Sequence, residues 1–388
     1  MRLLTVNGSY VQFNIWSSTY CKTYRSKIII KKKLLFIVEA MGGGVFTYIY
    51  NLSNELCVKY DIYIAYSTRP QTPTNFKSFF NKNIQLIEVH DFKREINFVS
   101  DLKSAIDLRK IVNKINPDII HLHSSKAGAI GRIIFNNRKI PLFYTPHGYS
   151  FLMNGNYLKN KFYMLVELKL SKLGCTTISC SLGEHEETLK MTHNARVVNN
   201  GINISEIEST LAKTFLNTKK SITRQVFTLG RITEQKNPYL FNQIAEAMPN
   251  IKFLWIGDGE LRNVLTAENI EIKGWLSRED ALVTASKADV FLLTSKWEGL
   301  PISLLEAMYL KKTCVVSNVI GNKDVIENKY NGFICNNITD YITAISSNQK
   351  LLGQKAHETI LSKYNMKLMG EEYNKIYSEG MNKYKKRT

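Results

Sequence analysis

The sequence has no run of about 18 uninterrupted apolar residues, the length that a membrane-crossing helix needs. Three lysines, Lys31, Lys32 and Lys33, interrupt its most apolar N-terminal stretch. The first 33 residues carry seven basic and no acidic residues, but they lack the continuous apolar block and the small-residue cleavage site of a signal peptide. These absences predict a cytoplasmic chain that neither spans a membrane nor is exported.

Cysteine is scarce, and its spacing shows no pattern of a metal site or of a disulfide framework. The six cysteines are Cys21, Cys57, Cys175, Cys180, Cys314 and Cys335. Cysteines without such a pattern are expected to remain free thiols in a reducing cytosol.

Acidic residues are in the minority, and the resulting net charge of +19 is unevenly distributed along the chain. The residues before Leu34 contribute +7, residues 34–200 another +7, residues 201–380 only +1, and the last eight residues +4. This imbalance indicates an anionic partner on the N-terminal half, such as a membrane surface, a phosphorylated acceptor or nucleic acid. A solubilising lysine-rich surface explains the charge equally well. We expect no nucleic acid, because no zinc-finger, helix-turn-helix or RNP-type motif accompanies the charge.

Short runs rich in β-branched residues alternate with amphipathic helical stretches, the pattern of a parallel α/β sheet. The expected strands of the first half are 34–38, 62–66, 84–89, 118–123, 141–145 and 175–179. The pattern restarts after Gly201, with strands expected at 225–229, 251–256, 289–294 and 313–317. We therefore predict two doubly wound, Rossmann-like domains that face a central cleft, with ligands at the carboxyl ends of the strands.

The same patterns divide the chain into five parts. Residues 1–32 are a basic N-terminal extension, expected to be disordered or to follow from a misassigned start codon. Residues 33–203 form the first domain, and residues 204–222 a linker with some helix, rich in Ser, Thr, Asn and Lys. Residues 223–365 form the second domain. A C-terminal helix over 366–388 is expected to cross back to the first domain.

A glycine loop, Gly42-Gly43-Gly44, follows the first expected strand and precedes a helical pattern. The backbone N–H groups of Gly43 and Gly44, at the positive end of a helix, can bind a phosphate. A tight strand-to-helix turn is an equally good interpretation. The loop matches neither the dinucleotide fingerprint nor the phosphate-loop motif, which disfavours an NAD or ATP enzyme.

Histidines end two of the expected strands. His121 and His123 are two residues apart in one strand and should share a face, and His147 follows the strand at 141–145. The pair could bind a metal, but no third ligand lies nearby in the sequence, so we expect polar groups at the rim of the cleft. A lone histidine such as His147 is usually structural. The case for a functional role of His147 depends on the motifs of the second half.

Two cations lie at a strand-to-helix junction in the second half. Arg231 follows the strand at 225–229, and Lys236 lies five positions further on. Together they can neutralise a diphosphate leaving group, and a solvent-exposed pair is the alternative. The next strand leads into a glycine turn with Gly257 and Gly259, which could approach a nucleoside base or be a turn alone.

The most informative segment is 288–308. Glu298 follows a buried strand, Pro301 can occupy the first turn of the next helix, and Glu306 lies more than one turn inside that helix. Glu298 can accept hydrogen bonds from sugar hydroxyls, with Glu306 placed for a ribose. A carboxylate on an otherwise apolar helix face needs partners, which favours a ligand role over plain exposure.

Six motifs in this order resemble glycosyltransferase family 4, the retaining group with the GT-B fold. They are the glycine loop, Tyr-Thr-Pro-His-Gly at 144–148, Asn-Asn-Gly-Ile-Asn at 199–203, Gly-Arg-Ile-Thr-Glu-Gln-Lys-Asn-Pro at 230–238, Gly-Asp-Gly-Glu-Leu at 257–261, and the pair Glu298 and Glu306. The resemblance covers roughly residues 33–380. Within this family, the sequences of the segments 121–128 and 144–151 look like those of capsule, exopolysaccharide and O-antigen enzymes.

The resemblance implies that the second domain binds the donor and that the first lies on the acceptor side. Gly43 and Gly44 would present amides to the donor phosphates. Arg231 and Lys236 would hold the diphosphate, and the turn Leu300-Pro301 would lie near it.

The remaining implied roles concern the sugar and the nucleoside. Glu298 would bind the transferred sugar, and His147 would lie beside the sugar and the acceptor. Glu306 would hold the ribose hydroxyls, and the base would lie near Gly257 and Gly259.

The resemblance further implies that no metal and no cofactor takes part, and the chain contains no Asp-x-Asp pair. Front-face attack, in which the departing phosphate oxygen takes the acceptor proton, would explain retention, and a short-lived covalent intermediate is the alternative. The favoured donor is a UDP-hexose or UDP-N-acetylhexosamine, with a GDP-sugar second. The implied acceptor is lipid-linked or an oligosaccharide, in surface polysaccharide biosynthesis.

Two other classes of protein stay open. One is a nucleotide-sugar epimerase or a phosphorylase on the same fold. The other is a binding module that uses its charge for nucleic acid or membrane and keeps a vestigial cleft. A vestigial site is disfavoured because the charged residues that the resemblance assigns to the site are all present: Arg231, Lys236, Glu298 and Glu306.

Residues 157–172 combine apolar residues with four lysines, Lys159, Lys161, Lys169 and Lys172. A helix here would be apolar and basic at once, and it could lie in an anionic lipid interface at the inner face of the cell membrane. The alternative is a helix buried against the sheet with its lysines in water.

Overall fold

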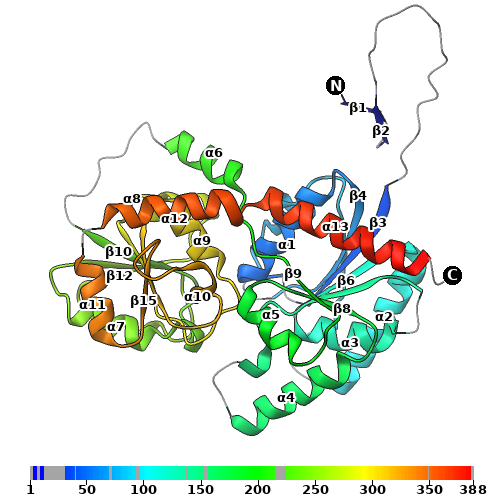
Figure 1. The fold of residues 1–388 in the computed structure, drawn as a ribbon, viewed down its shortest axis with the longest axis horizontal. Coiled ribbons are helices and arrows are strands. Elements are labelled where there is room, and N and C mark those ends of the chain that lie inside the picture. The colour runs from blue at the N-terminus through cyan, green and yellow to red at the C-terminus, as the bar shows by residue number, and fades with distance from the viewer. Residues whose placement is uncertain are drawn as a thin grey trace, which may run out of the picture.

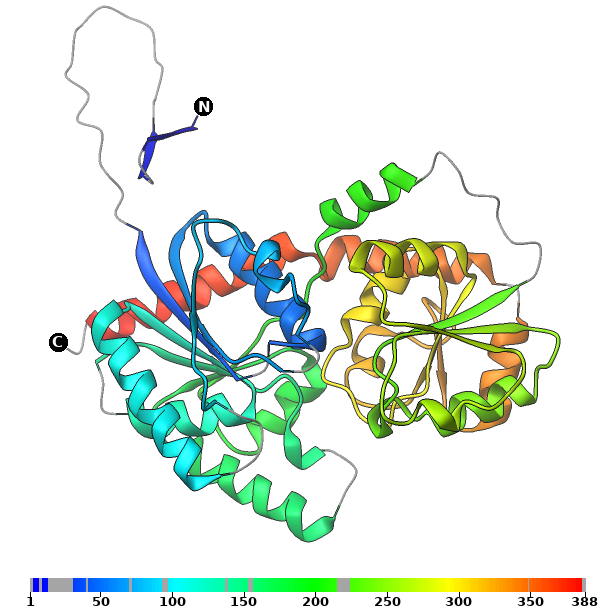
Figure 2. The ribbon, with the colours of Figure 1, turned by 180° about the vertical axis from the view of Figure 1, so that it is seen from behind.

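The computed structural model describes residues 3–6, 9–12, 31–39, 41–69, 72–92, 97–136, 139–152, 156–214, 224–347 and 349–385. These residues form two domains that lie side by side, each built on a parallel β-sheet with helices on both faces (Figures 1 and 2). The predicted architecture of two parallel α/β domains is confirmed. None of the described helices is both long and apolar enough to cross a membrane.

The first sheet has seven strands in the order β5-β4-β3-β6-β7-β8-β9, and all neighbours pair in parallel. In chain order they are β3 (Lys32–Val38), β4 (Tyr60–Tyr66), β5 (Gln85–Glu88), β6 (Ile119–His123), β7 (Leu142–Thr145), β8 (Thr176–Ser179) and β9 (Ala195–Val197). The helices of this domain are α1 (Gly43–Leu56), α2 (Phe98–Ile115), α3 (Ser125–Phe135), α4 (Tyr157–Leu170) and α5 (Leu182–Leu189).

Strand β3 is buried on both faces. Leu34, Phe36 and Val38 join an apolar cluster with residues of α1, whereas Leu35 and Ile37 join a second cluster with residues of α2 and α3. A strand covered on both faces is a continuous apolar run in the sequence, so its position could be predicted.

The second sheet has six strands in the order β12-β11-β10-β13-β14-β15, also parallel. The strands are β10 (Gln225–Leu229), β11 (Lys252–Ile256), β12 (Ile270–Gly274), β13 (Val290–Leu293), β14 (Thr313–Ser317) and β15 (Phe333–Cys335). The helices are α7 (Pro238–Glu246), α8 (Arg278–Lys287), α9 (Ile302–Tyr309), α10 (Asn322–Val325), α11 (Ile338–Ser346) and α12 (Lys350–Lys363).

Three strands of the two parallel sheets, β9, β12 and β15, are absent from the sequence prediction. Strands β9 and β15 have three residues each, too few to show a period. Strand β12 is an edge strand in which every residue is partly exposed, so it carries no apolar run.

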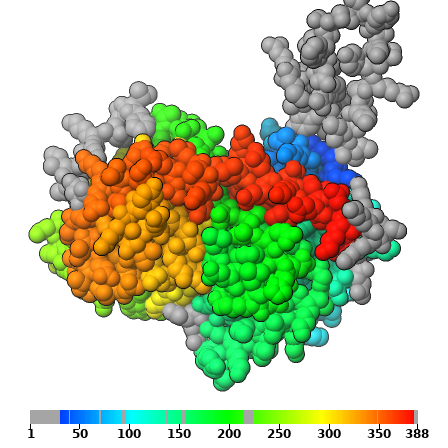
Figure 3. All heavy atoms as spheres, in the orientation of Figure 1, coloured from blue at the N-terminus to red at the C-terminus, as the bar shows by residue number. Residues whose placement is uncertain are grey.

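Two segments connect the domains. Helix α6 (Ile204–Thr214) occupies the first part of the predicted linker, whose remainder lies outside the described residues. Helix α13 (Met366–Lys385) follows α12 and runs back over the first domain, and Figure 3 shows α12 and α13 as one band along both domains. Its apolar stripe, which includes Met369, Tyr373 and Tyr377, is buried in the same cluster as β3 and α1.

The two connections touch where they cross between the domains. The backbone nitrogen of Ile202 donates to the carbonyl of Tyr364 at 3.0 Å, and that of Met366 donates to the carbonyl of Ile202 at 2.9 Å. A Cβ atom added at Gly201 would lie 2.6 Å from the backbone of Asn365. The glycine of the Asn-Asn-Gly motif therefore allows the two crossings to lie in contact.

The N-terminal extension differs in part from the expected disorder. Strands β1 (Leu3–Val6) and β2 (Ser9–Gln12) pair as an antiparallel hairpin. Lys32 already belongs to β3. Residues 13–30, for which disorder is also expected, lie outside the described residues.

Candidate active site

The glycine loop opens helix α1. Gly42 is the N-cap residue, and Gly43 has a φ of +58°, a conformation that disfavours side chains. A Cβ atom added at Gly43 or Gly44 would meet nothing within 4 Å. The positive end of α1 therefore faces open space, where an anionic group can approach.

His147 follows β7 on a strained backbone. Its φ is +57°, and such conformations persist where the surrounding structure holds them, often at functional sites. The ring lies edge-on to that of Tyr48, with centroids 4.4 Å apart, and its Nε2 lies 3.1 Å from Nδ1 of His123. Burial lowers the pKa of His147 to about 3, so the ring is neutral near pH 7.

The protons of this histidine pair can be assigned from hydrogen-bond partners. In the described part of the chain, the buried Nε2 of His123 has no partner. Burial also lowers the pKa of His123, so each ring carries one N–H. Because an unpartnered buried N–H is rarer than an unpartnered acceptor, His123 carries its proton on Nδ1 and donates it to Nε2 of His147. His147 then carries its proton on Nδ1 and can donate a hydrogen bond to a ligand from that nitrogen.

His121 and His123 lie beneath the site and not at the rim of the cleft, which corrects the sequence prediction. Both side chains are fully buried. The hydroxyl of Tyr377 lies 2.6 Å from Nδ1 of His121, and that of Thr145 lies 2.9 Å from Nε2. Because Tyr377 belongs to α13, this contact fastens the C-terminal helix to the strand behind the site.

The two domains meet directly beside His147. A Cβ atom added at Gly299 would lie 3.3 Å from the backbone nitrogen of Gly148 and 3.4 Å from the carbonyl carbon of His147. The buried carboxylate of Glu184 holds this turn, accepting the N–H of Gly148 at 2.6 Å. The loop that carries Glu298 therefore packs against the turn that carries His147.

Glu298 and Lys236 form an ion pair at this boundary. Nζ of Lys236 lies 2.6 Å from Oε1 of Glu298, and the hydroxyl of Ser295 donates to the same oxygen at 2.6 Å. The amide of Gln235 donates to Oε2 at 3.3 Å. Only 6% of the Glu298 side chain is exposed, so these contacts hold its carboxylate in one orientation.

Arg231 lies at the carboxyl end of β10, partly exposed, and forms no ion pair with another described residue. The predicted glycines pack beside it. A Cβ atom at Gly257 would lie 2.2 Å from the carbonyl oxygen of Gly230, and one at Gly259 would lie 2.3 Å from that of Ile232. Both glycines are thus needed where two loops touch, and their approach to a base stays a prediction.

The turn Leu300-Pro301 leads into α9. Pro301 is the N-cap residue of that helix, one position before the predicted first turn. Leu300 is buried, and its carbonyl oxygen accepts a hydrogen bond from the side-chain amide of Asn200 at 2.8 Å. The Asn-Asn-Gly motif thus braces the turn that follows Glu298.

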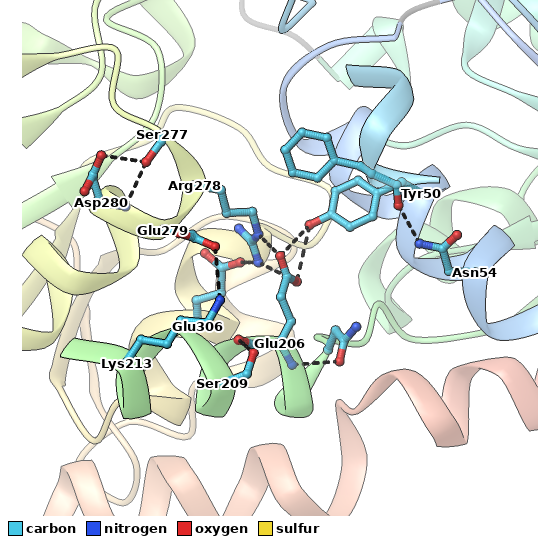
Figure 4. A network of polar contacts seen from close by, with 12 residues as sticks. Tyr50, Asn54, Glu206, Ser209, Lys213, Ser277, Arg278, Glu279, Asp280 and Glu306 are labelled. Atoms are coloured by element: carbon cyan, nitrogen blue, oxygen red, sulfur yellow. Dashed lines mark hydrogen bonds and ion pairs between the residues drawn. The ribbon is translucent and has the colours of Figure 1, made fainter. Parts of the chain in front are cut away.

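Glu306 is buried on α9, where Nη2 of Arg278 lies 2.7 Å from its Oε1. The same guanidinium donates through Nε to Glu206 of α6 at 2.8 Å, and the hydroxyl of Tyr50 donates to Glu206 at 3.2 Å. Figure 4 shows these side chains converging from α1, α6, α8 and α9. Burial alone would lower the pKa of Arg278, but Glu306 and Glu206 raise it above its usual value.

Contacts therefore join some of the predicted site residues and leave others apart. Lys236 pairs with Glu298, whose loop touches the turn of His147. No described contact joins the glycine loop or Arg231 to this group, although α1 reaches His147 through Tyr48.

Several residues at the site are missing from the sequence prediction, among them Glu184, Tyr48 and Arg278. Glu184 follows Ser181 in a capping-box spacing, a signal that the sequence did offer. Tyr48 and Arg278 had no such signal, because their partners lie on distant elements.

The described residues include neither a candidate metal-binding group nor a disulfide bond. No group of three His, Cys, Asp or Glu side chains is placed among them to hold a metal ion. The described cysteines are buried free thiols, whereas Cys21 lies outside the described residues.

Two family models match the chain in succession. The Glycosyltransferase Family 4 model matches residues 42–206, and the model for Glycosyl transferases group 1 matches residues 211–365. A UDP-Gal:alpha-D-GlcNAc-diphosphoundecaprenol alpha-1,3-galactosyltransferase of Escherichia coli is 32% identical over 295 residues, 69% of this chain and 75% of that protein. The O-antigen biosynthesis glycosyltransferase WbnH of Escherichia coli is 26% identical, over 80% of this chain and 88% of that protein.

Solved structures with the same fold cover nearly the whole chain. A sucrose-phosphate synthase of Thermosynechococcus elongatus aligns with a TM-score of 0.77 at 15% identity, over 90% of this chain and 99% of that chain. HepE of Anabaena, in complex with UDP and glucose, aligns with a TM-score of 0.71 at 14% identity, over 90% of this chain and 100% of that chain. With its two domain models matched in order and the resemblance of its motifs confirmed, the chain belongs to the glycosyltransferases of the GT-B fold.

Proposed function

We propose that this glycosyltransferase moves a sugar, with retention of its anomeric configuration, from a nucleotide diphosphate-sugar to a lipid-linked or oligosaccharide acceptor in surface polysaccharide biosynthesis. The observation that carries the proposal is the contact between the turn of His147 and the loop of Glu298. Through this contact the loop that carries the fixed carboxylate of Glu298, paired with Lys236, packs against the turn that carries His147. The relatives supply the substrate classes, since one is a UDP-galactose enzyme with a diphosphoundecaprenol-linked acceptor.

The proposed chemistry assigns charge stabilisation to the second domain. Arg231 and Lys236 neutralise the diphosphate as it leaves, in a site where preorganised cations need no rearrangement. Glu298, already fixed by Lys236, accepts hydrogen bonds from the hydroxyls of the transferred sugar. His147 donates a hydrogen bond from its Nδ1–H group to an oxygen of the sugar or of the acceptor, and its ring keeps this proton and stays neutral.

The direct test is Glu298→Ala. We expect most turnover to be lost, because the carboxylate should contact sugar hydroxyls, while the protein still folds with some loss of stability, because Lys236 loses its partner. The matched control is Glu234→Ala, which removes a carboxylate from a more exposed ion pair with Lys296. Near-full activity of the Glu298 variant with the true donor would show that the sugar lies elsewhere.

The donor is proposed to be a UDP-hexose or UDP-N-acetylhexosamine, with a GDP-sugar as the second choice. A thermal-shift panel of nucleotides and nucleotide sugars distinguishes the bases. A ligand at 100 times its dissociation constant stabilises the fold by about 2.7 kcal/mol. Stabilisation by guanine nucleotides alone would reverse the ranking.

Retention and the absence of a metal are separate parts of the proposal. The anomeric configuration of the product, read by NMR, tests retention. Activity should persist in EDTA, because Arg231 and Lys236 carry the charge that a divalent ion would otherwise supply. Loss in EDTA that is restored by a metal would refute this part.

We also propose that helix α4 attaches the first domain to the anionic inner face of the cell membrane. Of its apolar side chains, Leu158 is 72% exposed, Phe162 57% and Leu165 47%, and these exposed side chains support an apolar contact on this side of the helix. Lysines lie among these apolar side chains, and each cation near the surface contributes about 1 kcal/mol to binding of an anionic membrane. A lipid-linked acceptor would then meet the site from this domain.

Co-sedimentation with anionic and neutral vesicles tests the attachment. The variant changes four lysines to Gln: Lys159, Lys161, Lys169 and Lys172. The control changes four lysines of the second domain to Gln: Lys323, Lys350, Lys355 and Lys363. Only the first variant should lose binding to anionic vesicles. Equal binding by both variants, or none by the wild type at low salt, would favour a soluble acceptor.

A further inference from the structure

The ion pair between Arg278 and Glu306 has a geometry that leaves one carboxylate oxygen free. Nη2 of Arg278 donates to Oε1 of Glu306, and no other described group donates to that carboxylate. Only 4% of the Glu306 side chain is exposed. A carboxylate held through one oxygen cannot rotate freely, so its second oxygen keeps one direction.

Arg278 is itself held from a second side. Glu206 accepts from Nε at 2.8 Å and lies 3.5 Å from Nη2. A planar guanidinium can bridge two carboxylates in this way, whereas a lysine ammonium cannot reproduce the fork. One cation thus lies between two carboxylates, and it fixes the position of both.

The network also spans the two domains. Tyr50 lies on α1, the helix that the glycine loop opens, and its hydroxyl donates to both oxygens of Glu206, at 3.2 and 3.4 Å. Figure 4 shows Tyr50 on the first-domain side and Arg278 and Glu306 on the other, with Glu206 between them. The orientation of Glu306 is therefore linked to the position of the first domain.

We propose that Arg278 is a positioning residue for donor recognition: it aims the free oxygen of Glu306 at the ribose hydroxyls, and Glu206 and Tyr50 hold it in place when the domains are together. The inference rests on the proposed function, in which Glu306 binds the ribose of a nucleotide diphosphate-sugar. It adds a residue that selects ribose over deoxyribose without touching the nucleotide.

The test is a ratio of affinities, measured by calorimetry on the full chain with UDP and 2′-deoxy-UDP. If UDP does not bind, GDP and 2′-deoxy-GDP are used. The wild type should prefer the ribose form at least about tenfold, the value of one hydrogen bond to a charged group. Glu306→Gln should lower this preference, and Arg278→Lys should lower it to within about threefold of unity.

Two further variants make the result specific. Lys213→Gln is the matched control, because Lys213 pairs with Glu279 at 3.8 Å on the exposed side of the same network and should keep the wild-type ratio. Glu206→Gln keeps Arg278 and provides a second test if Arg278→Lys fails to fold. It should lower the ratio at least about threefold, since the guanidinium loses one of its two charged partners.

The outcomes separate the inference from the proposed function. If Glu306→Gln loses the preference and both Arg278→Lys and Glu206→Gln keep it, the role of Arg278 is overturned and the donor site stands. A wild type that binds UDP or GDP without preference for ribose overturns the inference, because Glu306 then does not contact the ribose. If neither nucleotide binds, the proposed function fails, and the inference fails with it.

Discussion

At the scale of the residue, each side chain of the site is held by a neighbour distant in sequence. Lys236 fixes Glu298 from 62 positions away, and His123 fixes the ring of His147 from 24 positions away. Arg231 is different, because no other described residue pairs with it. It is therefore the cation that can respond most directly to a bound diphosphate.

Replacing Arg231 by Ala should lower kcat by about 10²–10³, the loss typical of one electrostatic contact made in the transition state. Steady-state kinetics with saturating donor measures it. The control is Arg262→Ala, since Arg262 pairs with Asp258 in the same domain and half of its side chain is exposed. Unchanged turnover in the Arg231 variant would place the diphosphate elsewhere.

Acid should destabilise the protein through its buried histidines. The pKa of His147 falls to about 3 in the fold, whereas an unfolded histidine titrates near 6.5. The unfolded chain therefore binds more protons between these values, and the free energy of unfolding falls as the pH drops below about 6.5. The slope is at most about 1.4 kcal/mol per pH unit for each such histidine.

Denaturant unfolding between pH 7 and pH 4.5 measures this slope. His147→Asn should lower this slope by close to the contribution of one histidine, about 1.4 kcal/mol per pH unit. His90→Gln is the matched control, because 84% of the His90 side chain is exposed. An equal slope in the wild type and in His147→Asn would contradict a neutral ring at position 147 in the folded protein.

At the scale of the element, a buried ion pair fastens α4 to the first domain. Nη2 of Arg132 on α3 lies 2.7 Å from Oε2 of Glu167 on α4, and both side chains are at least nine-tenths buried. The hydroxyl of Tyr144 on β7 donates to the other oxygen at 3.1 Å. These contacts hold one side of α4, so its opposite side can stay exposed for the proposed membrane contact.

Glu167→Ala should destabilise the fold by about 3–5 kcal/mol, because it leaves the Arg132 guanidinium buried without its counter-charge. Urea unfolding followed by circular dichroism measures the loss. Glu187→Ala is the control: Glu187 pairs with Lys190 on the surface, where such pairs contribute at most about 1 kcal/mol. Equal losses in both variants would mean that the α4 pair is not buried in solution.

At the scale of the whole molecule, the domains are joined by two chain crossings in contact. Gly201 permits that contact, so Gly201→Ala should lower the free energy of unfolding by about 1–3 kcal/mol, the usual cost of overpacking. It should also raise KM for the donor, because the cleft geometry depends on the same crossing.

Gly44→Ala is the matched control for stability. An added Cβ at Gly44 meets nothing within 4 Å, so unfolding should be unchanged or slightly more difficult. If Gly201→Ala unfolds with the same free energy as the wild type, the close contact of the two crossings does not contribute to stability.

The sequence by itself determined the two-domain α/β architecture and supplied the candidate residues of the site. Strands such as β3 and β13 are buried on both faces, and a continuous apolar run is visible without knowledge of what covers it. Glu298 and Arg231 could be predicted for a related reason. Each follows such a strand, and the carboxyl ends of parallel strands are where ligands bind.

Tertiary structure alone decided which residues act together. Three contacts of the site join separate elements. They are the pair of Lys236 with Glu298, the contact of Gly148 with Gly299, and the ion pair of Arg278 with Glu306. Local periodicity carries no information about such contacts, because the same helix or strand forms whichever partner it later meets. The burial of His121 and His123 was missed for that reason: the strand placed them on one face, and α13 covered His121 while Tyr48 of α1 covered His123.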